Sequence, residues 1–291
     1  MFTHTRYWFH IAQRAYRSWR EHDVPLLSAA IAFYAMLSLS PLLVVAVAVT
    51  ALVVEPDVAS QYLINLVAQA VNDETARFVQ DVLRNTQRAS NTFSAAGISL
   101  LLMLLGAARL FRQLKAAVNI IWGTRAALQG MRATVRDHLL AVLMVLLVAT
   151  ALLVWLGVDI VLAALSARWK PVSAVWRWLN FGAGWALATL LFASAYHLLP
   201  DERIRWRDVW AGAAIGAFLF ALCKLLVGVY LGLTGVQSAY GAASAAVVLL
   251  LWAYFSTQAF LFGAEWARVV WEINRGGEPA TTPPVSSPHT R

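Results

Sequence analysis

The sequence predicts an all-α, polytopic membrane protein with six transmembrane helices, an amphipathic N-terminal helix and an outer helical hairpin between the first two spans. Its 291 residues are 60% hydrophobic and only 13% charged, with a mean hydropathy of +0.64, whereas soluble domains are about 25% charged. The apolar residues also fall into runs of roughly 20 residues or more, the length that a helix needs to cross a bilayer. The net charge of +8 fits basic loops beside anionic lipid and does not indicate a nucleic-acid partner.

Residues 1–25 form a basic amphipathic segment, which we expect in the cytoplasm. On a helix over residues 6–20, one face is apolar and the other basic. The apolar face holds Trp8, Ile11, Ala12, Ala15 and Trp19, and the basic face holds Arg6, His10, Arg14, Arg17 and Arg20. Two interpretations stay open: a helix in the membrane interface, or a helix packed on the protein's own inner surface.

Six apolar runs are the predicted spans, and only helices satisfy the backbone inside lipid. They lie at 26–54, 93–112, 139–165, 174–199, 208–233 and 240–269. Together with the outer loop 55–92 they make one transmembrane domain, 26–272. Residues 273–291 are rich in Pro, Ser and Thr and predict a disordered cytoplasmic tail.

The basic residues predict the orientation. With the N-terminus inside, sixteen Lys and Arg lie in inner segments and six in outer segments. Because basic residues collect on the cytoplasmic side, both termini are expected in the cytoplasm of a bacterial inner membrane.

The first span, "LSAAIAFYAMLSLSPLLVVAVAV", carries polar residues and a proline. Pro41 cannot donate to the carbonyl of Leu37, so the helix should bend there, and Ser38 or a neighbouring helix should satisfy the carbonyl. The predicted bundle-facing stripe is Ala30, Tyr34, Ser38, Pro41 and Val45. The predicted lipid-facing residues are Leu39, Leu43 and Val47.

The loop 55–92 predicts two amphipathic helices separated at Asn72-Asp73, with Asp73 as the cap of the second. Their apolar faces must be buried against the bundle, the outer leaflet or a partner, and the bundle is favoured. A possible envelope protein partner would bind through 58–90. The apolar faces comprise Tyr62, Leu63, Leu66, Val67 and Ala70 in the first helix, and Phe78, Val79, Val82 and Leu83 in the second.

Charged residues inside spans are costly and often functional. Lys224 and Asp159 are expected in the outer half of the membrane. They either pair, or Lys224 faces a water-filled cavity, or Lys224 extends outward along its aliphatic stem.

Glu265, near the inner end of the last span, should pair with Arg109, Arg112 or Arg268. A structural tie is favoured over a substrate site. A positive pocket for phosphate headgroups made by Arg109, Arg112 and Lys115 is the alternative.

The fifth span has small residues at helix-packing spacing. They form two G-x-x-x-G pairs, Gly212 with Gly216 and Gly228 with Gly232. Packing within the monomer is preferred to a dimer face.

Four stretches resemble the YihY/BrkB family of bacterial inner-membrane proteins. They are "AAIAFYAMLSLSPLL" (29–43), "LKAAVNIIWG" (114–123), "LLPDERIRWRDVWAGA" (198–213) and "YGAASAAVVLLLWAYFSTQAFLFGAEWARV" (240–269). The resemblance covers most of residues 20–272 and implies six transmembrane helices. Some members have carried a ribonuclease label and others are linked to serum resistance, while transport or envelope-lipid roles have been suggested.

No catalytic motif, metal-ligand spacing or cofactor motif accompanies these stretches. None of the six histidines forms an H-x-H or H-x-x-x-H pair. We therefore expect no enzyme, no cofactor and no metal, and nothing favours a ribonuclease. The leading hypothesis is a transporter or flippase-like protein for an amphipathic or anionic envelope molecule. The alternative is a non-transporting scaffold for envelope machinery.

Overall fold

The computed structural model describes residues 2–39, 54–89, 109–124, 173–202, 204–234 and 244–275, with single residues and short pieces of 43–51 and 139–158. Within these ranges every secondary-structure element is an α-helix. The all-helical fold class is therefore confirmed for the part of the chain that is described. Pro41, Asp159, most of the second span and part of the third lie outside it.

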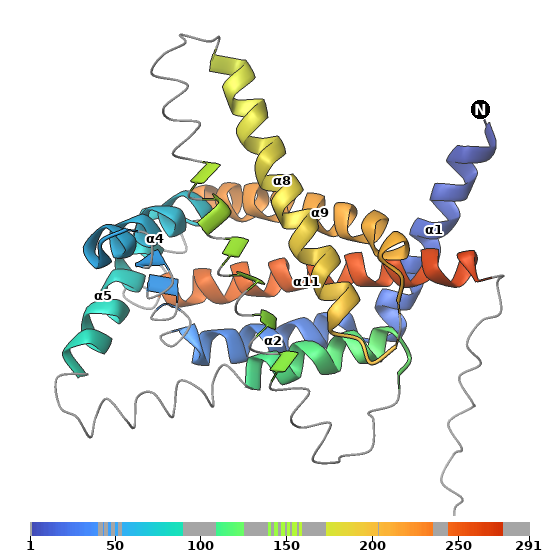
Figure 1. Cartoon of the computed structure of the whole chain (residues 1–291), viewed down its shortest axis with the longest axis horizontal. Coiled ribbons are helices and arrows are strands. Elements are labelled where there is room, and N and C mark those ends of the chain that lie inside the picture. The colour runs from blue at the N-terminus through green and yellow to red at the C-terminus, as the bar shows by residue number, and fades with distance from the viewer. Residues whose placement is uncertain are drawn as a thin grey trace, which may run out of the picture.

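Three long helices form the centre of the molecule: α8 (Ser173–Leu198), α9 (Trp206–Thr234) and α11 (Ser244–Asn274). They contain 26, 29 and 31 residues, so each is longer than the ~20 residues that a transmembrane helix needs. All three are apolar enough to cross a membrane by length and composition. In Figure 1, α11 lies between α9 and α2, and α8 crosses over α9.

α9 and α11 approach each other most closely at glycines. A Cβ atom placed on Gly212 would overlap the carbonyl of Gly263 and lie 2.6 Å from the Cβ of Ala267. A Cβ on Gly216 would lie 2.9 Å from the Tyr196 hydroxyl oxygen. The first G-x-x-x-G pair thus faces another helix of the same chain, while the surroundings of Gly228 and Gly232 lie outside the described residues.

The first predicted span is interrupted. α2 (Val24–Leu37) contains 14 residues, and helical residues resume at Leu39 after a turn at Ser38. Ser38 is buried, and its hydroxyl donates to the carbonyls of Tyr34 and Ala35, at 2.8 and 3.2 Å. The break at Ser38 falls three residues before Pro41, close to where a bend was expected, but Ser38 satisfies different carbonyls from that of Leu37.

Two helices occupy the 55–92 loop, α4 (Pro56–Ala70) and α5 (Asp73–Ala89). The cap of α5 is Asn72, whose side-chain oxygen accepts from the Thr75 amide at 2.8 Å. The prediction that Asp73 is the cap was therefore wrong by one residue. A hydrogen bond from Ser244 to Glu74 ties α5 to the start of α11.

The apolar faces of α4 and α5 pack against the first predicted span. Leu43 forms a buried cluster with Val79 and Leu83 of α5, and Leu39 and Val47 contact it. The prediction that Leu39, Leu43 and Val47 face lipid was therefore wrong. Leu39, Leu43 and Val47 pack against α5 because the apolar face of α5 is stabilised by being removed from water or lipid headgroups.

The N-terminal helix α1 (Phe2–Glu21) packs on the C-terminal part of α11. Ile11 and Ala15 are fully buried against Trp266, Val269 and Val270. This is packing on the protein's own surface, one of the two interpretations of the amphipathic pattern. In Figure 1, α1 crosses the end of α11 steeply and its N-terminus projects away from the bundle.

Candidate functional site

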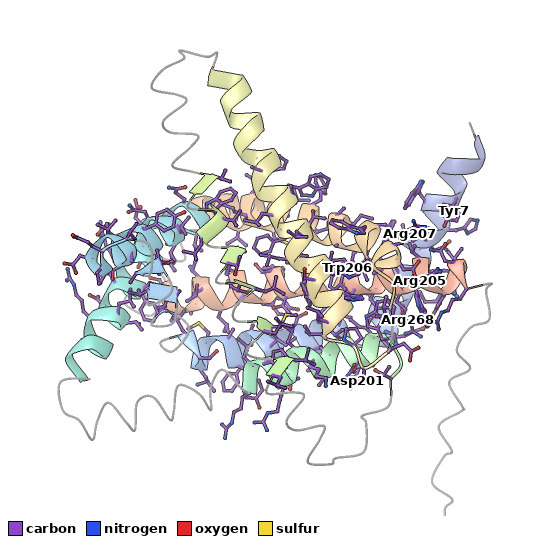
Figure 2. All side chains as sticks on the ribbon, in the orientation of Figure 1. Tyr7, Asp201, Arg205, Trp206, Arg207 and Arg268 are labelled. Carbon is purple, nitrogen blue, oxygen red and sulfur yellow. The ribbon has the colours of Figure 1, made fainter. Side chains whose placement is uncertain are left out.

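Charged side chains gather at the end of the bundle where α1, the C-terminal part of α11 and the loop before α9 meet. Figure 2 shows Asp201, Arg205, Arg207 and Arg268 at this end. We call the group His22, Glu265, Arg268 and Glu272, with Arg14, the α1–α11 network. The main apolar core lies next to this network. It is formed where α2, α8, α9, α11 and residues 117–122 meet.

Glu265 is the most buried member of the network. Its side chain is 0% exposed, and its Oε1 lies 2.6 Å from Nδ1 of His22. A carboxylate removed from water is strongly destabilising without a partner. The expected partners were Arg109, Arg112 or Arg268. The direct partner is instead His22, while Arg109 and Arg112 are exposed.

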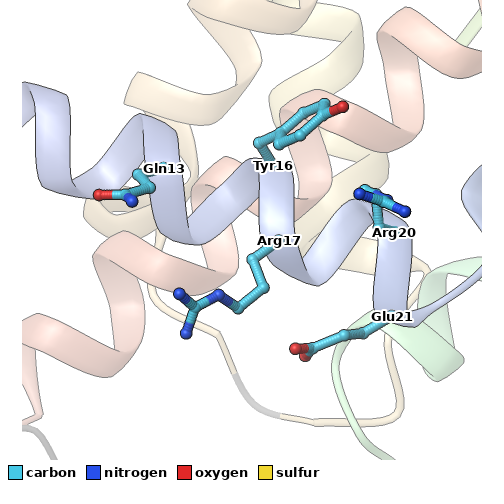
Figure 3. Close-up of a pocket in the computed structure, with 5 residues that line it drawn as sticks. All are labelled: Gln13, Tyr16, Arg17, Arg20 and Glu21. Atoms are coloured by element: carbon cyan, nitrogen blue, oxygen red, sulfur yellow. The ribbon is translucent and has the colours of Figure 1, made fainter.

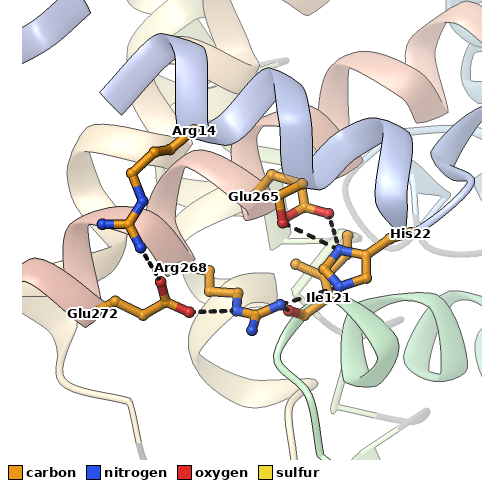
Figure 4. Close-up of polar contacts among 7 residues, drawn as sticks. Arg14, His22, Ile121, Glu265, Arg268 and Glu272 are labelled. Carbon is orange, nitrogen blue, oxygen red and sulfur yellow. Dashed lines mark hydrogen bonds and ion pairs between the residues drawn. The ribbon is translucent and has the colours of Figure 1, made fainter. Parts of the chain in front are cut away.

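The hydrogen bonds on both sides of His22 define its tautomer. Nη1 of Arg268 lies 3.2 Å from Nε2 of His22, and a guanidinium can only donate. Nε2 must therefore accept, which places the proton of a neutral imidazole on Nδ1, facing Glu265 (Figure 4). His22 thus bridges Arg268 and the buried carboxylate of Glu265 through two hydrogen bonds.

Arg268 joins three segments of the chain. Its Nε donates to Glu272 at 2.9 Å, and Nη1 donates to the carbonyl of Ile121. Glu272 also pairs with Arg14 of α1 at 3.1 Å. A basic residue of the inner surface was expected to bind Glu265. Arg268 reaches it only through His22.

The Ile121 carbonyl can accept from Arg268 because it lies in the last turn of the helix over 109–121, where the carbonyls have no partner further along the helix. Gly123 has a φ of +63°, and its amide donates to the Ile120 carbonyl while the Thr124 amide donates to Asn119. This pair of bonds is the Schellman motif, which a glycine in the left-handed region favours. The guanidinium of Arg268 meets the carbonyl end of that helix, where a positive charge is favourable.

A second cluster lies between the helix over 109–121 and the loop before α9. Lys115, only 7% exposed, pairs with Asp201 at 3.0 Å. The Asn119 amide donates to the same carboxylate at 2.9 Å and its oxygen accepts from the Asp201 backbone amide at 3.0 Å. Lys115 is therefore engaged by the partly buried carboxylate of Asp201, and it does not form one open phosphate pocket with the exposed Arg109 and Arg112.

A third cluster joins the start of α9 to the end of α11. Asp208 is buried and accepts from Nε of Arg205 at 3.2 Å and from Asn274 at 2.8 Å. Arg275 lies 3.7 Å from Glu202 and stacks over the Trp271 ring at 4.3 Å from its centroid. Together the three clusters connect α1, α9, α11 and the helix over 109–121.

The other predicted site residues lie apart from these clusters. Lys224 is exposed on α9, Tyr34 is half-buried, and Ser38 is buried at the break after α2. The expected pairing of Lys224 with Asp159 falls outside the described residues. Sequence reasoning did not single out His22, Asn119 or Asp201, although Asp201 lies in the "LLPDER" stretch that carried the resemblance.

The clusters are ionic ties rather than a metal centre. Among the described residues, no group of three or more His, Cys, Asp or Glu side chains could hold a metal ion. One oxygen of Glu265, Oε2, is buried without a hydrogen-bond partner. The hydroxyls of Ser28 and Ser256 are also buried and unpartnered.

The long apolar helices and the charged end of the bundle define this chain as a helical membrane protein. The sequence profile of the family described as "Virulence factor BrkB" matches residues 15–287. The chain therefore belongs to this family, as the resemblance in its sequence predicted.

Bacterial relatives named UPF0761 membrane protein are similar over most of this chain. The relative from Tolumonas auensis is 27% identical over 273 residues, covering 88% of this chain and 85% of its own length. The relative from Rhodospirillum centenum is 26% identical over 86% of this chain, and that from Albidiferax ferrireducens is 28% identical over 88%. This chain spans 54% and 61% of the length of those last two relatives. No solved structure matches the chain significantly.

Proposed function

We propose that the chain is a six-span protein of the bacterial inner membrane that acts as a transporter or flippase-like protein for an amphipathic or anionic envelope molecule. In this proposal both termini and the three charged clusters lie on the cytoplasmic side, and α4 and α5 lie on the outer side. The excess of basic residues in the segments next to the clusters supports that orientation.

The observation that carries the proposal is the interruption of the first span. α2 ends at Leu37 after 14 residues, a rise of about 21 Å, which is less than the ~30 Å hydrocarbon core. The apolar sequence nevertheless continues to Val54. Interrupted spans form the binding sites of many secondary transporters. At this break the carbonyls of Tyr34 and Ala35 accept from the buried Ser38 hydroxyl, so a substrate would have to displace that hydroxyl to reach them.

Lys224 is the reason to propose that the transported molecule is anionic. It is exposed on α9 between the apolar stretches "FALC" and "LLVG". A cation within an apolar helix is costly unless it reaches water, a headgroup or an anion. An anionic amphiphile passing along this face of α9 would meet Lys224.

Lipid movement in proteoliposomes tests the proposal. The purified full chain is reconstituted in vesicles of phosphatidylethanolamine and phosphatidylglycerol that contain a trace of tail-labelled fluorescent phosphatidylglycerol. We expect the protein to expose inner-leaflet label to a membrane-impermeant quencher, and Lys224→Ala to slow this movement while Lys224→Arg retains it. Arg77→Ala, which removes an exposed charge from α5, is the matched control. Movement no faster than in protein-free vesicles, with folded protein present, would contradict a role in moving this lipid.

The scaffold function remains the alternative, and the α4–α5 pair favours it. Its apolar side packs against Leu43, and Ser244 donates to Glu74. The polar side is exposed and includes Arg77, Asp81 and Arg84. An envelope partner could bind there without any transport. Loss of cellular function on changing these three residues, with lipid movement unchanged, would favour the scaffold.

We propose a non-enzymatic role for the titratable residues at the bundle end. His22, Lys115 and Asp208 each contact a group on another segment of the chain. Their hydrogen bonds tie helices together and leave them little freedom to act on a substrate.

A further inference from the structure

The helix α1 has two opposite faces with different surroundings. The face that contains Ile11, Ala15, Ser18 and His22 is turned to the protein: the first two are fully buried, and His22 contacts Glu265. The spacing of these residues by three and four places them on one side of the helix. This side fixes α1 to α11.

The opposite side of α1 is exposed and combines aromatic and basic residues. It is formed by Phe9, Gln13, Tyr16, Arg17 and Arg20. Phe9 is 69% exposed and Tyr16 is 53% exposed, which are large fractions for aromatic side chains. We call these five residues the outer face of α1.

No described residue outside α1 forms an ion pair with the charges of this face. α1 contains four arginines and one acidic residue, Glu21. Arg14 is engaged by Glu272, whereas Arg17 and Arg20 form no ion pair within the described residues. Both arginines line an open pocket of about 460 Å³ with Gln13, Tyr16 and Glu21 (Figure 3).

The elements next to this face have features that are typical of the lipid headgroup region. α1 leads directly into α2 through His22 and Asp23, where the first apolar span begins. At the same end of the bundle, Trp206 and Trp210 are exposed on the first turns of α9 (Figure 2 shows Trp206). Exposed tryptophans at the end of an apolar helix are typical of the membrane interface.

We propose that the outer face of α1 is a binding site for an anionic phospholipid of the adjacent leaflet. The lipid phosphate lies between Arg17 and Arg20, with Gln13 and the Tyr16 hydroxyl as further hydrogen-bond donors. Guanidinium groups bind phosphate oxygens through paired N–H donors, and Phe9 and the Tyr16 ring lie at the boundary with the acyl chains. Glu21 opposes the anion and limits its affinity. This site is independent of whether the protein transports anything.

Lipid binding to the full chain tests the site. Native mass spectrometry of the detergent-solubilised protein is used to titrate phosphatidylglycerol, with phosphatidylcholine in parallel. We expect the double variant Arg17→Gln/Arg20→Gln to bind phosphatidylglycerol about 25-fold more weakly, at about fivefold per arginine, with phosphatidylcholine binding unchanged. Glu21→Gln should strengthen phosphatidylglycerol binding.

The matched control is Arg77→Gln/Arg84→Gln, which removes two exposed charges from α5. We expect this pair to change the affinity less than twofold. An equal loss in both double variants would show that the total charge matters and not the site, and no loss in Arg17→Gln/Arg20→Gln would also overturn the proposal. Binding of soluble glycerol phosphate as tightly as of the lipid would overturn the assignment to a membrane lipid. All four arginines are exposed, so unfolding of either variant is not expected, and a thermal melt checks it.

Discussion

The middle of α11 and its C-terminal part are held to their neighbours by different interactions. Around Gly263, the backbones of α9 and α11 come together at Gly212, and the Tyr196 hydroxyl donates to the Phe260 carbonyl at 2.5 Å. Two residues later, Glu265 begins a series of charged contacts that reaches α1 and the helix over 109–121. Within a single turn of α11, ionic contacts are therefore added to apolar packing, which continues at Ala267 against α9 and at Val269 and Val270 against α1.

The difference follows from the surroundings that each part meets. Lipid tails are as apolar as leucine, so helices inside the hydrocarbon core associate through close packing and hydrogen bonds. At the bundle end, the loops and α1 approach water, and ionic groups can be partly solvated or paired. Specific pairs such as His22 with Glu265 then determine the position of α1 on α11, because apolar packing alone would allow α1 to bind α11 in several positions.

The largest effect is expected at the buried carboxylate. His22→Leu leaves the fully buried Glu265 carboxylate without its direct partner, while Arg268 keeps Glu272. Removing one partner of a buried ionic network is destabilising by about 4 kcal/mol. The free energy of unfolding in mixed detergent micelles measures it. His22→Leu/Glu265→Leu should be less destabilised than His22→Leu alone, because the double variant leaves no unpaired buried charge, and a larger loss in the double variant would contradict the direct coupling.

The next effect is expected where α9 meets α11. Gly212→Ala places a methyl group against the Gly263 carbonyl, so one of two helix backbones must shift, at a cost of about 3 kcal/mol. Gly182→Ala in α8 is the control, because no atom lies within 4 Å of its added Cβ, and its stability should be unchanged or higher by up to about 1 kcal/mol. Equal stability of both variants would show that the glycine contact is not close.

A smaller effect is expected at Tyr196. Tyr196→Phe keeps the ring contacts with Phe192 and Phe260 but leaves the Phe260 carbonyl without the hydroxyl. Hydrogen bonds between transmembrane helices contribute about 0.6–1 kcal/mol. The same unfolding measurement detects this loss. A loss as large as that of His22→Leu would mean that the two regions do not differ as proposed.

The sequence predicts the apolar part of this molecule better than the charged part. The last three spans and the α4–α5 helices follow from runs and periodicity, since both depend on neighbouring residues. The partner of Glu265 could not be read in the same way, because His22 lies 243 residues away and its role depends on the position of α1. Leu39, Leu43 and Val47 were assigned to lipid because the sequence does not show that α5 packs against them.

The same reasoning applies to the basic residues that follow the second predicted span. Arg109, Arg112 and Lys115 lie within seven residues of the sequence and look alike there. The fold separates them, since Lys115 turns to Asp201 while the two arginines are exposed. On α1 the same separation occurs between Arg14, which meets Glu272, and Arg17 and Arg20 on the outer face.

The smallest effect is expected at Arg14, and it sharpens the contrast with Glu265. The Arg14 side chain is 50% exposed, and an exposed ion pair contributes at most about 0.5 kcal/mol because water and salt screen it. Arg14→Gln should therefore leave the free energy of unfolding almost unchanged at moderate salt, although Glu272 loses one partner. Arg268 still pairs with Glu272 at 2.9 Å, so the carboxylate keeps a counter-ion. A loss of several kcal/mol would mean that Arg14, and not the buried His22–Glu265 pair, fixes α1 to the bundle.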